Sequence, residues 1–350
     1  LILFINKCIH IKIKSCIKYL MEIRKSVNIS NILLVMFTIF AMIMLAINPG
    51  KYMQSCLNGI SIWGLSVLPA LFPFFFFSGI LTKLGVLDSL GNKLSKIMQK
   101  VFHTSGSSGI IYLLSIVSGY PVGAKITSDL YQKGVFNRNE VVRINAFAST
   151  SGPLFVIGAV GVGMLYNHAL GVILLAAHLL GALLNGLLYR NYHYKANNCI
   201  NIQNSQNINS TLSSTLYDSI ISILVVGGYI VIANILIDML GNIGVLEILA
   251  KVINFISNCL GYNADIGTGL GNGLLEITRG CKDLSYVSAS THIIAPLICG
   301  LISWGGISIH LQALTFLQKC NISAGFYMFQ KFTQAIISTI VCYLLCIFFV

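Results

Sequence analysis

The stretch Ser118-Gly119-Tyr120-Pro121-Val122-Gly123-Ala124-Lys125-Ile126-Thr127-Ser128-Asp129 interrupts a long apolar run. Glycine and proline break a helix at Gly119 to Pro121, and a lysine and an aspartate follow on what we expect to be the next helix. In a membrane, non-helical backbone is tolerated only where protein buries it or where it lines a cavity. Charged residues at that depth are costly and usually functional. The stretch therefore indicates an interrupted helix beside an internal polar site.

Composition places this stretch in a membrane protein. Of 350 residues, 56% are hydrophobic and only 9% are charged, whereas soluble domains carry about 25% charged residues. Such a chain cannot cover a soluble surface, so we predict a multi-pass protein in the lipid bilayer. The excess of 22 Lys and Arg over 10 Asp and Glu fits loops and interfacial helices rather than a nucleic-acid partner. The ten cysteines show no metal-ligand spacing, so we expect no bound metal or other cofactor.

The apolar segments predict an all-α integral membrane protein with about eight transmembrane helices, some of them interrupted. Residues 1–20 alternate isoleucine with lysine ahead of a start-like Met21, and we interpret them as a non-native or interfacial extension. Residues 21–54 hold the first span. A polar linker at 190–214, rich in Asn and Ser, then separates a first repeat at 55–189 from a second at 215–350.

The two sides of this linker resemble one another in sequence. Three matches occur in the same order: Leu81–Asp88 with Asp238–Glu247, Gly119–Asp129 with Gly271–Asp283, and Ser149–Gly158 with Ser303–Ile309. They predict two related repeats, which we expect to be inverted. Interrupted segments at matching positions of two repeats are the usual place of a transporter's binding site.

Three motifs together carry a family resemblance: Leu68–Phe74 (LPALFPF), Ser118–Lys125 (SGYPVGAK) and Gly271–Glu276 (GNGLLE). The combination resembles the sporulation integral membrane proteins of spore-forming bacteria, which carry a nucleoside-recognition Gate domain. These are distantly similar to the cores of concentrative nucleoside transporters. The resemblance covers the chain from roughly Ser55 to its last residue.

The resemblance implies a multi-pass protein of the mother-cell or outer forespore membrane that moves a small solute during sporulation. Dipicolinic acid is the expected solute, and a nucleoside is the alternative, so the partner is an anionic or nucleoside-like molecule. The related transporters contact a sodium ion as well. The sequence leaves open a coupling ion (sodium or a proton) or passive transport, and it leaves the oligomeric state open.

Lys125 and Asp129 lie four residues apart, on one face of a helix that starts near Val122. One interpretation is an exposed ion pair on an interfacial helix. The other is that Lys125 and the amides at this helix N-terminus receive a carboxylate. In the second repeat, Glu276 follows a glycine run and is the matching candidate, whereas a structural ion pair is the main alternative for Arg279.

Small hydroxyl residues at Ser149 to Ser151 either line a polar cavity or pack membrane helices closely. The single histidines His178, His292 and His310 lack companions at ligand spacing and predict neither zinc binding nor catalysis, so we expect no enzyme activity. The predicted substrate-binding set is Gly119, Tyr120, Pro121, Gly123, Lys125, Asn145, Ser149, Ser151, Asn272 and Glu276. A non-transporting scaffold or assembly factor of the spore envelope is the alternative function, but it would not need irregular backbone at membrane depth.

Overall fold

A computed structural model describes residues 29–193, 208–262 and 264–350. The chain divides into two compact units, Leu1–Gln54 and Ser55–Val350. The described part of the first unit holds α2 (Ile29–Ile47) and the start of α3 (Pro49–Ile62). The extension predicted at residues 1–20 lies outside the described residues, as does 194–207 of the predicted linker.

In the described residues every regular element is a helix, in agreement with the predicted fold class. Before the predicted linker the second unit contains the π-helical segment η1 (Trp63–Val67), α4 (Leu68–Lys83), α5 (Val86–Phe102), α6 (Ser107–Ser118), α7 (Val122–Gln132), α8 (Arg138–Asn145), the π-helical segment η2 (Leu154–Met164) and α9 (His168–Tyr189). After it come α10 (Ile208–Asn242), α11 (Val245–Cys259), α12 (Gly267–Leu275), α13 (Ile277–Ser285), α14 (Thr291–Trp304), α15 (Gly306–Leu317), the 3-10 turn η3 (Gln318–Cys320) and α16 (Ala324–Phe349).

The start of α10 corrects the predicted linker, because residues 208–214 are helical rather than extended. Their Ser and Thr side chains look like linker residues in sequence, yet Thr215 and Ser219 donate to the backbone carbonyl oxygens of Thr211 and Thr215, four residues earlier, at 2.6 and 2.7 Å. A hydroxyl satisfied within its own helix can be buried. The buried face of α10 then packs against α4, where Thr215 lies beside Gly79.

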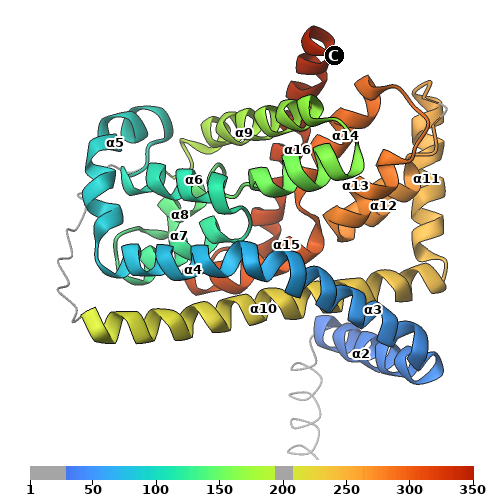
Figure 1. Cartoon of the computed structure of the whole chain (residues 1–350), viewed down its shortest axis with the longest axis horizontal. Helices are drawn as coiled ribbons and strands as arrows, with labels where there is room; N and C mark the ends of the chain where they lie inside the picture. Colours follow the sequence, from blue (N-terminus) through green and yellow to red (C-terminus); the bar gives the residue numbers. More distant parts are fainter. Residues whose placement is uncertain (1–28, 194–207, 263) are drawn as a thin grey trace, which may run out of the picture. The chain divides into compact units, whose positions relative to one another are not determined.

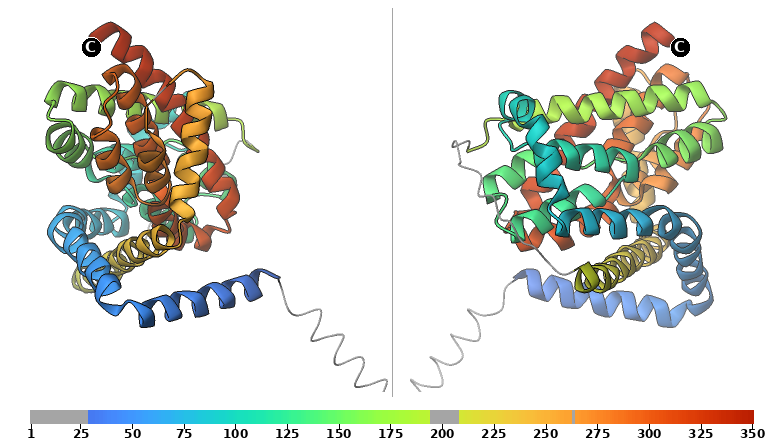
Figure 2. Two further views of the ribbon diagram at one scale, coloured as in Figure 1. Left: turned by 90° about the vertical axis from the view of Figure 1, so that its right-hand side faces the viewer. Right: turned by 60° about the vertical axis from the view of Figure 1, so that its left-hand side comes forward.

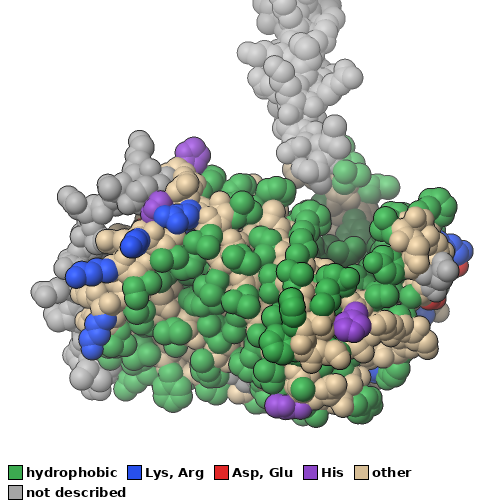
Figure 3. Space-filling model, turned by 90° about the horizontal axis from the view of Figure 1, so that it is seen from above, with side chains coloured by type: hydrophobic (Ala, Val, Ile, Leu, Met, Phe, Trp, Pro, Cys, Tyr) green, Lys and Arg blue, Asp and Glu red, His purple; other side chains and the backbone are tan. Residues whose placement is uncertain are grey.

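Four described helices are long and apolar enough to cross a membrane: His168–Tyr189, Thr211–Asn242, Thr291–Cys320 and Ala324–Phe349. The count rises to up to 6 if each of two bent helix pairs is one span, and the apolar helices Leu71–Lys83 and Leu154–Met164 are shorter. The predicted number of eight spans is reached only if both bent pairs and both shorter apolar helices are counted as spans. Large apolar side chains such as Leu154, Leu188 and Phe348 are exposed, as expected for contact with lipid. Figure 3 shows a face that is covered mainly by hydrophobic side chains.

The two sides of the linker present their helices in the same order. α4 and α10 each end before a glycine in the left-handed conformation, Gly85 (φ 70°) and Gly244 (φ 77°). An amphipathic helix follows each glycine, and then a pair of short helices joined by a break, α6 with α7 and α12 with α13. A second break and a long apolar helix complete each side, α9 in one and α16 in the other. The relation of the two sides as repeats stays a prediction.

Helices α4 and α10, the first long helices of the two sides, run antiparallel and side by side (Figure 1). Gly79 of α4 faces Thr215; in α3, which leads through η1 into α4, Gly59 faces Val231 and the Ser55 hydroxyl donates to Asp238 at 2.5 Å. The residue number therefore falls along one helix as it rises along the other. Equivalent helices of inverted repeats point in opposite directions, and the inversion itself stays a prediction.

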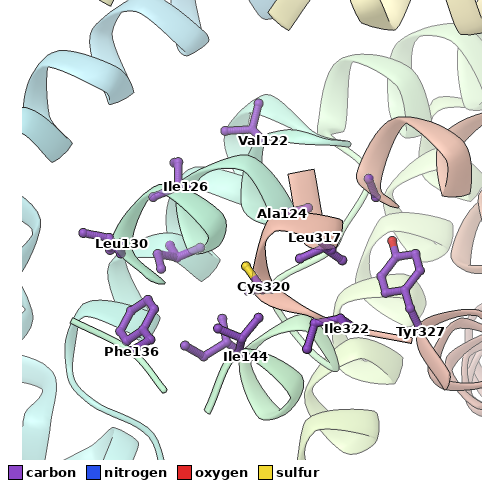
Figure 4. Packing of buried hydrophobic residues seen from close by; sticks show 14 of the residues in the cluster. Val122, Ala124, Ile126, Leu130, Phe136, Ile144, Leu317, Cys320, Ile322 and Tyr327 are labelled. Carbon is purple, nitrogen blue, oxygen red and sulfur yellow. The ribbon is translucent and has the colours of Figure 1, made fainter. Parts of the chain in front are cut away.

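Each of the two hydrophobic cores draws on both sides of the linker. One joins α7 and α8 to α10, α15 and η3, and Figure 4 shows Val122, Ile126 and Leu130 of α7 beside Leu317 and Cys320. The other joins η2 and α9 to α12, α13, α14 and α16. Figure 2 shows α16 passing α9 and α14, the helices against which it packs. The two sides are thus interlocked, and their breaks are brought together.

Candidate functional site

A cavity of about 750 Å³ lies where the interrupted helices meet. Its polar wall comes from the break after α6, the break before η2, the break between α12 and α13, and the start of α15. η1, α4 and η2 supply most of the apolar wall, and α10 adds Ile230. The lining residues used below are Tyr120, Ser151, Gly158, Glu276, Ser308 and Gln312.

The first break is shaped by Gly119, which follows the last residue of α6. Its φ of 83° lies in the region that favours glycine, and the peptide bond from Tyr120 to Pro121 is cis. A Cβ atom on Gly119 would lie 2.9 Å from the backbone nitrogen of Gly152. The absence of a side chain therefore lets the first break touch the second, which precedes η2.

The second side builds the same arrangement from other residues. Glu276 has an extended backbone between α12 and α13, and its carboxylate accepts hydrogen bonds from the amides of Thr278 (3.0 Å) and Arg279 (2.8 Å). It therefore caps the N-terminus of α13, where a negative charge is favourable. Gly306, with φ 78°, lies against this break, and a Cβ there would be 2.9 Å from the Leu275 carbonyl oxygen. On both sides, then, glycine allows two breaks to abut.

Lys331 of α16 links the two breaks of the first side, and it was absent from the predicted site. Its ammonium donates to the Tyr120 hydroxyl (2.9 Å), the Ser149 carbonyl oxygen (2.8 Å) and the Gln334 side-chain oxygen (2.6 Å). The side chain is 1% exposed. The lysine follows Phe326 in an apolar span, where sequence reasoning found only a membrane helix. The polar stripe formed by Lys331, Gln334 and Ser338 on one helix face is the signal that could have revealed it.

His178 of α9 joins the breaks of both sides. Its Nε2 accepts the Ser151 amide hydrogen at 2.9 Å, and its Nδ1 lies 2.7 Å from the Ser303 hydroxyl oxygen. Because an amide can only donate, Nε2 must be unprotonated, so the ring is neutral and Nδ1–H donates to Ser303. Both ring nitrogens of His178 are therefore engaged by the breaks.

The structure brings part of the predicted site together. Gly119, Tyr120, Ser151 and Glu276 line the cavity. Pro121, Gly123, Lys125, Asn145, Ser149 and Asn272 are not among the lining residues. Their role in binding remains a prediction.

These other residues have contacts of their own. Lys125 pairs with Asp129 at 3.0 Å and its ammonium lies 5.8 Å from the Phe75 ring centroid. The Asn145 amide donates to the Val141 carbonyl oxygen at 2.9 Å, and that of Asn272 donates to Asp283 at 2.6 Å. The Ser149 hydroxyl lies 3.2 Å from the Tyr327 hydroxyl. The Pro121 carbonyl oxygen accepts a hydrogen bond from the Lys125 amide at 3.1 Å, and Gly123 packs against the Ala148 backbone.

Arg279 forms an ion pair with Asp238 of α10 at 2.8 Å, while Glu276 is held by backbone amides instead. Arg279 therefore forms the structural ion pair that the sequence analysis gave as its alternative role. Glu276, which forms no ion pair with it, lines the cavity. Within the part of the chain that the structure describes, no group of three or more His, Cys, Asp and Glu side chains is placed to hold a metal ion.

The chain resembles known proteins in three comparisons. Residues 64–166 match the family model of the Gate domain, described as nucleoside recognition. The chain is 26% identical over 334 residues to the sporulation integral membrane protein YlbJ of Bacillus subtilis (strain 168), over 89% of this chain and 82% of that protein. It is also 29% identical over 132 residues to an uncharacterized protein of Alkalihalophilus pseudofirmus, over 36% of this chain and 28% of that protein.

The solved structures that match the chain include states of the protein CNTnw. A variant in its intermediate 3 state has a TM-score of 0.48 at 14% identity, over 93% of this chain and 85% of that one. The inward-facing substrate-bound state has a TM-score of 0.47 at 14% identity, over 81% and 75%. The predicted resemblance to sporulation integral membrane proteins with a Gate domain is confirmed.

Proposed function

We propose that this membrane protein is a transporter or facilitator that moves a small solute through the cavity at the helix breaks. The observation that carries the proposal is that breaks from both sides of the linker line one cavity. Irregular backbone at membrane depth is tolerated where it lines a cavity, and a scaffold has no evident need for it. The volume of about 750 Å³ falls within the range of about 300–1,000 Å³ that is typical of small-molecule sites.

The solute that we favour is dipicolinic acid, moved across a forespore membrane. The similarity to a sporulation membrane protein over 89% of the chain supports a role in sporulation. The lining is mostly apolar, with a few polar groups such as Tyr120 and Gln312, and this suits a flat aromatic ring that carries polar substituents. A nucleoside is the second candidate, because residues 64–166 match a domain described as nucleoside recognition.

Uptake into vesicles tests the function directly. Purified protein would be reconstituted in liposomes, and the accumulation of radiolabelled dipicolinate and uridine would be measured with no gradient, with a sodium gradient and with a proton gradient. We expect the protein to accelerate entry of dipicolinate over that in empty liposomes. The dependence on each gradient identifies the coupling ion or shows passive transport.

A matched pair of glycine variants connects uptake to the cavity. Gly158 lines the cavity, and the nearest atom to a Cβ built on it is a Leu154 methyl group at 3.8 Å. Leucine therefore fits at this position and extends into the cavity, so Gly158→Leu should reduce uptake at least tenfold. Gly228 of α10 has no atom within 4 Å of its Cβ position and lies outside the lining, so Gly228→Leu is the control. Equal uptake by both variants would argue against passage of the solute through the cavity. If the wild type transports neither dipicolinate nor uridine, the alternative function as a non-transporting scaffold is favoured.

A further inference from the structure

We propose that Lys331 sets the charge selectivity of the cavity, acting through the Tyr120 hydroxyl to recognise a carboxylate of the solute. The inference rests on the proposed function and names the residue that makes the site prefer an anion. Of the described residues, Lys125 and Lys331 are the lysines classed as buried, at 6% and 1% exposure. Lys125 has an acidic partner in Asp129, whereas no described acidic side chain forms an ion pair with Lys331.

A buried ammonium without a counter-ion is costly and is normally paired. The three acceptors of Lys331 are neutral: a hydroxyl, a backbone carbonyl and an amide oxygen. They satisfy its hydrogen bonds but leave its charge uncompensated. When it is protonated, Lys331 carries a positive charge that no ion pair among the described residues balances and that a bound anion would neutralise.

Buried polar side-chain atoms without a hydrogen-bond partner also occur further along α16 and on α15, in residues that are not among those lining the cavity. The Gln334 side-chain nitrogen and the Ser338 hydroxyl, three and seven residues further along α16, are buried without a hydrogen-bond partner. Both ring nitrogens of the buried His310 are also unpartnered. Most buried polar groups in folded proteins are hydrogen-bonded, so such a group of orphaned atoms calls for an explanation. Each of these side chains can donate a hydrogen bond, and an anion is the complementary acceptor.

Tyr120 connects the lysine to the cavity. Its hydroxyl oxygen accepts from the Lys331 ammonium at 2.9 Å, and Tyr120 is itself a lining residue. The hydroxyl proton points to the carbonyl oxygens of Ile302 and Ser303, both 3.4 Å away, well beyond the usual 2.5–3.0 Å of such bonds. A carboxylate in the cavity would be bound when this proton turns from these two long bonds and forms a shorter one to the carboxylate. An adjacent ammonium strengthens that bond, because it polarises the hydroxyl in a medium of low dielectric constant.

Glu276 is the acidic residue among those that line the cavity, and it does not cancel this preference. Its carboxylate is already engaged by two amides at the N-terminus of α13, where the helix dipole balances part of its charge. The anion site is therefore assigned to the Tyr120 wall of the cavity.

Binding measurements on the purified full-length protein in detergent test the assignment. Dipicolinate and uridine would be titrated against the wild type, Lys331→Gln, Tyr120→Phe and the control Lys251→Gln, whose lysine forms an exposed pair with Glu247. We expect dipicolinate binding at least tenfold weaker for Lys331→Gln and for Tyr120→Phe, and within twofold of wild type for Lys251→Gln. Uridine affinity should stay unchanged in Lys331→Gln. Lys331→Arg, which keeps the charge, should retain part of the dipicolinate affinity.

The thermal midpoint of the ligand-free protein separates recognition from a structural role. Removing an unpaired buried charge should leave the midpoint of Lys331→Gln equal to or above that of wild type. A lower midpoint together with unchanged dipicolinate affinity would show that Lys331 only holds the breaks in place. If Lys331→Gln does not fold, the dipicolinate affinity of Tyr120→Phe tests the assignment instead. This variant keeps the lysine and removes the hydroxyl through which it is proposed to act.

Two further outcomes distinguish this inference from the proposed function. A wild type that binds and transports uridine but no dipicolinate overturns anion recognition and leaves transport intact. Dipicolinate binding that depends on Lys331, without uptake in liposomes, supports the anion site and overturns transport. Loss of binding in Lys125→Gln with retention in Lys331→Gln would return the role to Lys125.

Discussion

Glu276 shows how one side chain can serve both local structure and the cavity wall. Its carboxylate takes up two amide hydrogens of α13 that would otherwise lack acceptors. Glu276→Ala should therefore lower stability by about 1 kcal/mol, seen as a lower thermal midpoint in detergent. Glu276→Gln keeps an acceptor oxygen and should cost less than the alanine variant.

The glutamine variant also isolates the charge of Glu276. If the carboxylate takes part in ion coupling, Glu276→Gln should reduce gradient-driven uptake while its midpoint stays near wild type. An alanine variant as stable as wild type would contradict the capping role.

Sequence reasoning located the breaks because glycine and proline in an apolar run are strong local signals. It placed Tyr120, Ser151 and Glu276 in the site, and these residues do line the cavity. It missed Lys331 because no helix breaker accompanies that lysine. Its significance comes from contacts with Tyr120 and Ser149, more than 180 residues away in the chain, and such contacts are fixed only by tertiary packing.

At the scale of elements, the two breaks of the first side depend on close approach of their backbones. Gly119→Ala would place a Cβ 2.9 Å from the Gly152 nitrogen and would impose a side chain on a φ of 83°. Both effects are unfavourable, and the neighbour is backbone that cannot turn away. We therefore expect a lower thermal midpoint and reduced uptake.

Gly228→Ala is the natural control, since this glycine lies inside α10 with open space around its Cβ position. Alanine in a helix interior is favoured over glycine by about 0.5–1 kcal/mol, so this variant should be as stable as wild type or more so. Equal midpoints for the two alanine variants would mean that the contact between the breaks is not a source of stability.

Element types were predicted better than element ends. The amphipathic helices α5 (Val86–Phe102) and α11 (Val245–Cys259) have the apolar spacing that indicates a helix with one buried face. The start of α10 was wrong because the hydroxyls of Thr215 and Ser219 bond within the helix, which composition alone does not reveal. The π-helical turns of η1 and η2 also left no separate signal, because they differ from α-helix only in hydrogen-bond spacing.

At the scale of the whole unit Ser55–Val350, the two sides of the linker are held together by buried polar contacts as well as by the cores. His178 reaches Ser303, the Asn185 amide donates to the Gln330 carbonyl oxygen at 3.2 Å, and Lys331 reaches Tyr120. Each bond has one partner on either side of the linker. Separating the sides would leave these groups unpaired and would also open both cores.

This interdependence predicts the behaviour of a divided chain. A break placed within residues 194–207 cuts none of the described helices. We expect the two fragments, co-expressed with a tag on one of them, to co-purify from membranes and to keep the thermal midpoint within a few degrees of the intact chain. The cut removes none of the described residues of either core.

Either fragment expressed alone should aggregate or be degraded, because the polar groups that it exposes in lipid have no water to bind. Size-exclusion chromatography in detergent distinguishes the cases. A single fragment that elutes as a monodisperse folded species would contradict the interlocked arrangement and would mean that each repeat folds as an independent domain. If only the co-expressed pair is monodisperse, the cavity forms only when both sides are present, and the breaks of one side alone do not make the site.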